Sequence, residues 1–225
     1  MNKTIYTTDW ELIDYNEAWD KQEKLFNEII RNKADNIPTR NHLIFCEHPH
    51  VYTLGKNGNE NNLLLNFIQL QAKKAAFIRT NRGGDITYHG PGQLVGYPIF
   101  DLGNFNMGLK EYIHKLEESI ILLLRIYGIH SERLPGATGV WLDTGTPQAR
   151  KICAIGVRAS HYVTMHGFAL NVNTDLQYFN FINPCGFTDK GVTSMEKELG
   201  SKVDMKNLKL QLKQEIEKQF SYKTA

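Results

Sequence analysis

The order of hydrophobic and polar residues along the chain predicts both helices and strands. Apolar residues recur at roughly helical spacing over residues 9–31, 108–127 and 204–220, and a smaller helix is expected at 66–76. Gly128 suits the end of the 108–127 helix, because glycine tolerates the left-handed cap conformation. Short apolar runs between turn residues predict strands at 42–46, 51–54, 76–79, 85–89, 93–102, 140–142, 151–157 and 165–172.

The predicted helices and strands are interspersed without a strict strand–helix–strand rhythm. This order favours a mixed-sheet α/β or α+β domain over a Rossmann fold. A length of 225 residues fits one large domain or two small ones. No repeat, low-complexity tract or obvious linker divides the chain, so a single domain over residues 1–225 is expected.

Composition and charge exclude several classes of protein. The chain is 41% hydrophobic and 22% charged, which rules out a disordered or fibrous protein. With 26 Lys and Arg against 24 Asp and Glu, its net charge of +2 argues against a nucleic-acid binder that works by bulk charge. The longest purely apolar run, residues 120–124, is far shorter than the ~20 residues of a membrane span.

The first ten residues and the cysteines bear on cellular location. Residues 1–10 include Asp9 and lack an apolar stretch, so no secretory signal is expected. The three cysteines, Cys46, Cys153 and Cys185, are too few and too scattered for a disulfide framework. The sequence therefore predicts a reduced, cytoplasmic protein.

A glycine-rich stretch, residues 82–93, is the first candidate for chemistry. Its glycines and Pro91 let the backbone approach a ligand closely, while Arg82 offers a charged fork and His89 is expected to titrate near neutral pH. A substrate-cradling loop and a plain hairpin with tight turns fit this stretch equally well. The spacing matches neither a Walker loop nor a dinucleotide fingerprint.

A thiol and an amine form the second candidate. Cys185 stands between Pro184 and Gly186 on a predicted turn, where a nucleophile could meet substrate, but its thiolate would need a cationic neighbour. Lys151 opens a predicted strand whose alternation places Cys153 on the same face. An inert buried cysteine and a solvated edge lysine are the alternatives that these residues leave open.

Histidines near Cys46 raise the question of a metal site. Cys46, His48 and His50 are spaced two apart and would share a face of a regular strand, but Pro49 interrupts it. No Cys-x-x-Cys or His-Glu-x-x-His pattern is present, so no metal site is predicted. The expectation is a turn in which His48 and His50 are partly exposed.

Several segments follow one another in a characteristic order and spacing, and together they cover about residues 42–200. They are Cys46-Glu47-His48-Pro49, 51–55, 82–95, Gly139-Val140-Trp141, 151–156, 166–172 and Asn183-Pro184-Cys185-Gly186. The ordered set is highly specific, and it resembles the octanoyltransferases of lipoate biosynthesis, a family that moves octanoyl from acyl carrier protein to lipoyl domains.

The resemblance implies a fold, an activity and a site. The fold is that of the biotin/lipoate protein ligase catalytic domain, an α+β domain with a mixed sheet flanked by helices. The activity is octanoyl transfer through a thioester on Cys185, with Lys151 as its partner and no cofactor, since a thioester needs no activation by ATP. The acyl site would be lined by Arg82, Gly83, Gly84, Asp85, Ile86, Thr87, Tyr88, His89, Ala154, Ile155, Gly156, Gly167, Phe168 and Ala169.

One position departs from the family, and one surface suggests docking. The family usually carries a small apolar residue where this chain has Cys153, so Cys153 is a rival nucleophile as well as a candidate core residue. Residues 66–84 carry four cations, and the interpretations left open are a surface that steers an acidic carrier protein and an ordinary solvated face. The expected partners are octanoyl-acyl carrier protein, lipoyl domains of 2-oxoacid dehydrogenase complexes and the glycine cleavage H protein. A monomer without nucleic-acid or membrane binding is expected.

Two other functions remain open from the residues. An ATP-dependent lipoate or biotin ligase on the same fold would use Lys151 to bind an acyl-adenylate and would not need Cys185. A non-catalytic binding module would present the glycine-rich loop to a partner and would show no turnover. The small residues Ala154, Gly156, Gly167 and Ala169 could leave room for an acyl tail or could serve tight strand packing.

Overall fold

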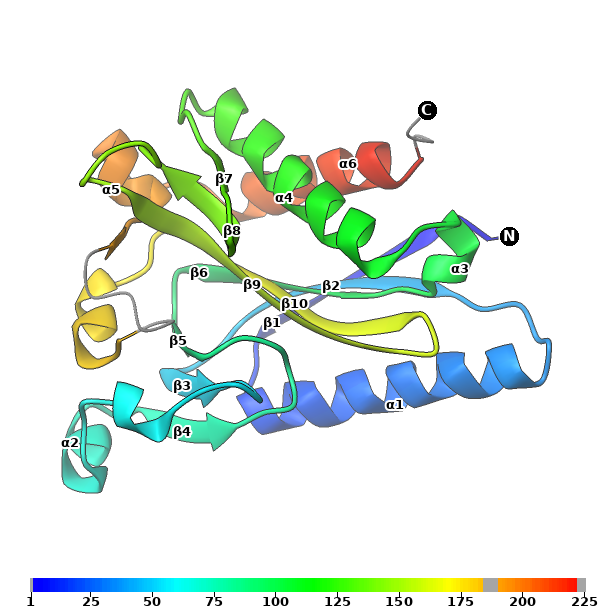
Figure 1. The fold of residues 1–225 in the computed structure, drawn as a ribbon, viewed down its shortest axis with the longest axis horizontal. Coiled ribbons are helices and arrows are strands. Elements are labelled where there is room, and N and C mark those ends of the chain that lie inside the picture. Colours follow the sequence, from blue (N-terminus) through cyan, green and yellow to red (C-terminus); the bar gives the residue numbers. More distant parts are fainter. Residues whose placement is uncertain (1, 184–189, 222–225) are drawn as a thin grey trace.

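A mixed β-sheet runs through the middle of the molecule (Figure 1). The computed structural model describes residues 2–183 and 190–221. Within these residues the larger sheet has eight strands, in the order β1-β2-β6-β10-β9-β8-β7 with β11 paired to β9. Its strands are β1 (Ile5–Leu12), β2 (Asn41–Glu47), β6 (Gln93–Ile99), β7 (Glu132–Leu134), β8 (Ala137–Leu142), β9 (Arg150–Ser160), β10 (Val163–Asn171) and β11 (Gly191–Val192).

The sheet is mixed because two of its pairings are parallel. β1 runs parallel to β2, and β11 runs parallel to β9, whereas the other neighbours are antiparallel. A smaller sheet of β4 (Ala76–Arg79), β3 (Val51–Leu54) and β5 (Ile86–His89) lies beside it. The smaller sheet packs with α2 (Phe67–Ala72) and the 3₁₀ helix η2 (Leu176–Phe181); a second 3₁₀ helix, η1 (Glu60–Asn62), precedes α2.

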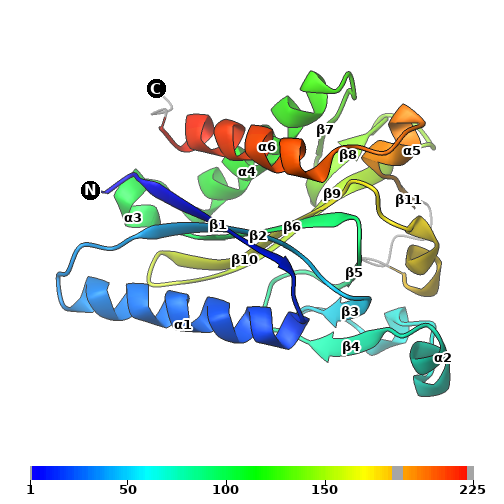
Figure 2. The same ribbon diagram turned by 180° about the vertical axis from the view of Figure 1, so that it is seen from behind.

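Helices cover both faces of the larger sheet (Figures 1 and 2). α1 (Tyr15–Ala34) lies on one face, while α4 (Leu109–Ile126) and α6 (Met205–Ser221) lie on the other. Alternation along β2 serves both layers, since Leu43 and Phe45 join the core under α4 and α6, and Ile44 and Cys46 join the core under α1. Two short helices complete the described chain, α3 (Leu102–Phe105) and α5 (Met195–Leu199).

Most predicted elements are confirmed. β3 and β4 have the predicted bounds, and β8 and β9, which contain the strands predicted at 140–142 and 151–157, pair antiparallel. Gly128 has a φ of +74° just after α4, as its role at the helix end requires. The expected fold class, a mixed α+β domain with helices on the sheet, is confirmed as well.

The expected helix over 9–31 is wrong in its first part. Residues up to Leu12 form the edge strand β1, and α1 begins only at Tyr15, after the N-cap Asp14 accepts hydrogen bonds from the backbone of Asn16 and Glu17. The half-exposed strand carries Trp10, which stands three residues before Ile13, a spacing that is also found in helices. The spacing of the apolar residues alone therefore predicted a helix that begins too early, before the Asp14 cap.

His48 also differs from its prediction. It is fully buried beneath α1 rather than partly exposed on a turn. Its Nδ1 lies 2.7 Å from the carbonyl oxygen of Ile13, and its Nε2 lies 2.6 Å from the hydroxyl of Tyr97. Both partners come from distant parts of the chain, so they are invisible in the local sequence. Burial lowers the pKa of His48 to about 4.

Candidate active site

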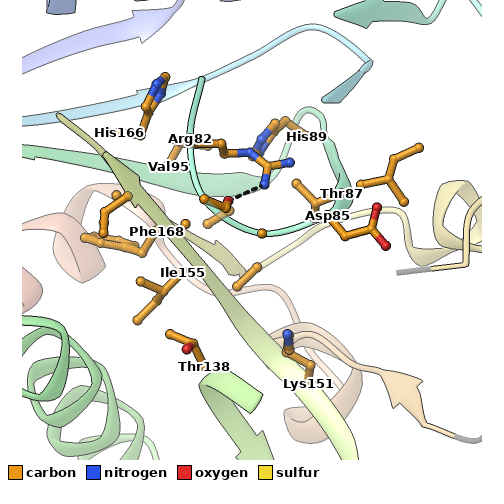
Figure 3. Close-up of a pocket in the computed structure, with 18 of the residues that line it drawn as sticks. Arg82, Asp85, Thr87, His89, Val95, Thr138, Lys151, Ile155, His166 and Phe168 are labelled. Carbon is orange, nitrogen blue, oxygen red and sulfur yellow. Dashed lines mark hydrogen bonds between the residues drawn. The ribbon is translucent and has the colours of Figure 1, made fainter. Parts of the chain in front are cut away.

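A cavity of about 530 Å³ lies between the β9–β10 pair and the glycine-rich loop (Figure 3). Figure 3 shows Arg82, His89 and His166 toward one end of the cavity and Lys151 with Thr138 toward the other. The structure brings most of the predicted acyl-site residues to this one space. Those that line it are Arg82, Gly83, Gly84, Asp85, Ile86, Thr87, His89, Lys151, Ala154, Ile155, Gly156, Gly167, Phe168 and Ala169.

Arg82 holds the glycine-rich loop in place. Its Nη2 donates to the carbonyl oxygen of Thr53 at 2.6 Å and to the Thr53 hydroxyl at 2.9 Å, and its Nη1 donates to the Gly83 carbonyl at 3.0 Å. The Gly83 N–H donates to the carbonyl oxygen of Val157 on β9 at 3.0 Å. The Arg82 side chain is thus buried against the cavity, so it does not belong to the basic surface considered over 66–84.

His89 belongs to a buried hydrogen-bond network whose partners fix its tautomer. The amide of Gln93 donates from Nε2 to Asn171 Oδ1 at 2.9 Å, so its Oε1 accepts from His89 Nδ1 at 2.8 Å. His89 Nε2 then accepts from the Thr53 hydroxyl at 3.3 Å. Burial, with the charges of His48 and Arg82, lowers the pKa of His89 to about 3. The expectation that His89 titrates near neutral pH is therefore wrong, and its ring is neutral there.

Tyr88 is the one described acyl-site candidate that the structure places elsewhere. Alternation along β5 turns its side chain away from the cavity. Its ring stacks on Tyr178 with centroids 4.9 Å apart, and its hydroxyl lies 2.7 Å from His50 Nδ1. Tyr88 thus stabilises the packing of η2 on the smaller sheet.

Lys151 stands at the start of β9, where the cavity meets β8 and β11. Its amine lies 4.6 Å from the centroid of the Trp141 ring, and the two residues are cross-strand partners. Val192 on β11 pairs with Lys151 on its other side, and the Thr193 N–H donates to the Lys151 carbonyl oxygen at 3.0 Å. Lys151 is therefore a half-buried residue of the cavity wall and not a solvated edge residue.

Cys153 is a core residue and not a rival nucleophile. The pairing of β8 and β9 is irregular between Lys151 and Cys153, and both Ile152 and Cys153 are fully buried in the core under α4 and α6. Cys153 does not line the cavity. Burial raises the pKa of its thiol, which disfavours the reactive thiolate. Cys46 is buried with a raised thiol pKa as well.

Cys185 lies outside the described residues, but the chain on both sides of it is placed. Before it, the Asn183 N–H donates to the carbonyl oxygen of Asn62 at 2.9 Å. Asn62 Nδ2 in turn donates to the carboxylate of Asp85 at 2.6 Å. After it, Lys190 and Gly191 line the same cavity as Lys151. Asp85 thus holds Asn62 in place by a hydrogen bond, and Asn62 in turn binds the segment that leads to Cys185.

The two glycines of the cavity floor serve close packing. A Cβ on Gly156 would lie 2.9 Å from the carbonyl oxygen of Gly83, and one on Gly167 would lie 2.2 Å from that of Gly96. Backbone from the glycine-rich loop and from β6 therefore occupies the space that a side chain would need. Of the two open explanations, tight packing accounts for Gly156 and Gly167.

Several residues that line the cavity were not predicted from the sequence. Trp141, His166 and Asn171 stand in the matched segments and could have been found there. Tyr15 lines the cavity from the start of α1, and nothing in the sequence around it indicates this position. His166 has a φ of +58° within β10, and burial lowers its pKa to about 3. The remaining unpredicted lining residues include Gln93, Val95, Tyr97, Thr138, Val157, Phe179 and Lys190.

Neither a metal-binding cluster nor a membrane-spanning helix occurs in the described part of the chain. Residues 2–183 and 190–221 contain no group of three or more His, Cys, Asp or Glu placed to hold a metal ion. Within the same two ranges, no helix combines the length and the apolar character that crossing a bilayer requires.

Solved structures share this architecture. A lipoate-protein ligase A bound with ATP superposes with a TM-score of 0.70 over 98% of this chain and 86% of its own, at 14% identity. A bipartite lipoate protein ligase from Thermoplasma acidophilum gives 0.68 over 98% and 86%, at 16% identity. At such low identity, the likeness establishes the fold alone, that of a lipoate ligase catalytic domain.

Sequence comparison identifies the family. Residues 14–217 match the lipoyl protein ligase A/B catalytic domain. Proteins named octanoyltransferase from Bacteroides fragilis and Flavobacterium johnsoniae are each 59% identical to this chain, over 95% and 93% of it and over 96% and 93% of their own lengths. The chain therefore belongs to the lipoyl protein ligase A/B catalytic domain family and, within it, to the octanoyltransferases, as the sequence motifs indicated.

Proposed function

We propose that this enzyme moves an octanoyl group from the thioester of octanoyl-acyl carrier protein to a lysine amine of a lipoyl domain, by way of a thioester on Cys185. Octanoyl transfer is the activity that the names of its relatives carry at 59% identity. The observation that supports the covalent route most strongly is the position of Lys151. Its strand pairs with β11, the first described strand after Cys185.

In the first half-reaction, the thiolate of Cys185 attacks the thioester carbonyl of the donor. The C–S bond to the enzyme forms, the C–S bond to the carrier breaks, and the carrier leaves as a thiol after taking up a proton from the Lys151 ammonium, which becomes neutral. An ammonium on Lys151 favours the thiolate, the reactive form, over the thiol. The His89 side chain does not donate to the oxyanion in this scheme, because its one N–H is held by Gln93.

In the second half-reaction, the amine of the acceptor lysine attacks the octanoyl-Cys185 thioester. An amide bond forms, and the sulfur of Cys185 leaves as the thiolate. The attacking amine must be neutral and must lose a proton as the amide forms. Lys151, left neutral by the first half-reaction, accepts that proton and returns to the ammonium form. One lysine therefore stabilises the anionic sulfur first and acts as a base afterwards.

The cavity supplies an apolar wall for the acyl chain. Val95, Ile155 and Phe168 line it together with Ala154 and Ala169. At ~0.8 kcal/mol per buried methylene, seven methylene-sized units contribute on the order of 5 kcal/mol. Burial of this size is enough to select a chain length where the slot is closed.

The partners and the location of the enzyme follow from this reaction. The donor is octanoyl-acyl carrier protein, and the acceptors are the lipoyl domains of 2-oxoacid dehydrogenase complexes and the glycine cleavage H protein. We place the reaction in the cytoplasm and assign it to a monomer. The bipartite ligase of Thermoplasma acidophilum is described together with its E2 lipoyl domain, and an acceptor of this kind is consistent with that pairing.

The test separates transfer from ligation. Purified enzyme is given octanoyl-acyl carrier protein and a lipoyl domain without ATP, and in parallel free octanoate or lipoate with ATP. We expect a lipoyl domain heavier by one octanoyl group in the first reaction and unmodified domain in the second. Modification that depends on ATP and the free acid would assign the ligase activity instead.

A further inference from the structure

An apolar surface is left open on and beside α2. Ile68 and Phe67 are 75% and 72% exposed, more than the other large apolar side chains of the described chain, and Leu64 is 51% exposed. A helix on a protein surface ordinarily buries its apolar residues, yet α2 buries only Leu70. These three residues, Leu64, Phe67 and Ile68, are called the α2 patch below. Clustered exposed apolar side chains are typical of an interaction site.

The α2 patch is attached to the chain that leads to Cys185. The Leu64 N–H donates to the carbonyl oxygen of Phe181 at 2.9 Å, and Leu63 forms an antiparallel bridge with Ile182. The amine of Lys73, just after α2, lies 4.0 Å from the centroid of the Phe181 ring. None of the three patch residues lines the cavity. A protein docked on the patch would therefore sit beside the active site and not over it.

The segment that carries the α2 patch is positively charged. Residues 56–79 contain four cations and one acid, a net charge of +3 in a chain whose total is +2. The acid, Glu60, forms an exposed ion pair with Arg79, and Lys56 and Lys74 are exposed. Exposed apolar side chains on a positively charged segment complement a partner that presents apolar side chains among carboxylates.

We propose that the α2 patch docks the acidic carrier protein that delivers the acyl thioester. This inference rests on the proposed function and adds the surface that binds the donor protein. The thioester of a carrier stands at the end of a long pantetheine arm, which can enter the cavity from a protein bound at its side. The acceptor amine stands on a lysine side chain of only four methylenes, so its domain must sit over the cavity itself. The off-centre position of the patch therefore fits the donor.

The test changes the patch and measures the two half-reactions separately. Phe67→Glu and Ile68→Glu place a carboxylate on the surface, and Leu210→Glu, at a 56% exposed site on α6, is the matched control. Formation of the octanoyl-enzyme is followed by mass spectrometry, with octanoyl-acyl carrier protein or with octanoyl-pantetheine as donor. The preloaded enzyme is then mixed with a lipoyl domain. We expect each patch variant to lower kcat/KM at least tenfold with the carrier donor, to match the wild type with octanoyl-pantetheine, and to match it in the lipoyl-domain step.

Three results would overturn the docking assignment. They are an equal loss with both donors, a loss confined to the lipoyl-domain step, and a loss no larger than that of Leu210→Glu. Calorimetric binding of octanoyl-acyl carrier protein, with every variant carried on a Cys185→Ser background, separates this assignment from the proposed function. Weaker binding in the patch variants supports the docking site even where the wild type forms no acyl-enzyme, a result that would contradict only the proposed function. Equal binding in all variants contradicts the docking site.

Discussion

The amine of Lys151 lies 4.6 Å from the ring centroid of Trp141, directly across the β8–β9 pair. Both residues line the cavity. The orientation of the Trp141 ring is fixed by a hydrogen bond that its Nε1 donates to the Ala137 carbonyl oxygen at 3.0 Å. An ammonium over an aromatic face is stabilised by about 0.5–2 kcal/mol relative to the same ammonium without the ring. Trp141 therefore favours the charged form of Lys151 and fixes where that charge lies.

Replacing Trp141 tests this contact. Trp141→Leu removes the ring face that holds the Lys151 ammonium in this position, so we expect alkylation of Cys185 at pH 7 to slow by roughly 2- to 10-fold. Trp141→Phe keeps an aromatic face and should retain most of the rate. The measurement is the pH profile of Cys185 alkylation, whose lower limb should move to higher pH in Trp141→Leu. Equal profiles for the Leu and Phe variants would mean that Trp141 only packs the core.

Buried histidines make the fold sensitive to mild acid. Burial lowers the pKa of His48 to about 4 and the pKa values of His89 and His166 to about 3, against an ordinary value near 6.5. Below pH 6.5 the unfolded chain binds protons at these sites and the folded chain does not, so stability falls as the pH falls. We expect a loss of up to about 1.4 kcal/mol per pH unit for each histidine between pH 6.5 and pH 4.

Urea unfolding at pH 7.5, 6 and 5 measures this loss. The exposed His130 is the control position, and the loss of stability below pH 6.5 should persist in His130→Asn, which keeps all three buried rings. A free energy of unfolding that is constant between pH 7.5 and 5 would show that the buried rings take up protons in the folded state.

Arg150 and Glu198 connect β9 to α5 next to Lys151. Arg150 Nε and Nη2 each donate to the Glu198 carboxylate at 2.8 Å, and the Thr193 hydroxyl also donates to it. The Arg150 hydrogen bonds hold the pKa of Glu198 below its usual range, so this stabilisation is present above pH ~4.5 and is lost as the pH falls below it.

Glu198→Gln tests this pair. It keeps the shape of the side chain but loses the charge, and we expect the free energy of unfolding to fall by about 1–3 kcal/mol at pH 7. Glu217→Gln, in an exposed pair with Lys213, should cost less than about 0.5 kcal/mol. Equal small effects from both variants in denaturant titrations would contradict a special role for the Arg150–Glu198 pair.

Local patterns predicted much of this fold, and distant contacts decided the rest. α4 ends at Ile126, just before Gly128, in agreement with its sequence signal, and β4 has its predicted bounds. The strand β1 was missed because it lies at the edge of the sheet, where its side chains are half exposed and lack a clean alternation. The Asp14 cap was a signal that could have separated β1 from α1.

In the candidate active site, too, some features could be predicted from the sequence and others depend on contacts between distant residues. The ordered motifs indicated the lining of the cavity, because segments distant in sequence carried the family pattern. The orientation of Tyr88 and the neutral state of His89 depend on alternation within a four-residue strand and on partners such as Gln93 and Thr53. The irregular pairing that leaves Cys153 in the core follows from β8 and could not be read from the strand itself.

The central claim is that Cys185 carries the octanoyl group. The direct measurement is peptide mapping by mass spectrometry after the enzyme is mixed with octanoyl-acyl carrier protein and quenched in acid. We predict one octanoyl group on the peptide that contains Cys185, retained in Cys153→Ala and lost in Cys185→Ser. An octanoyl group that persists in Cys185→Ser and disappears in Cys153→Ala would contradict the account.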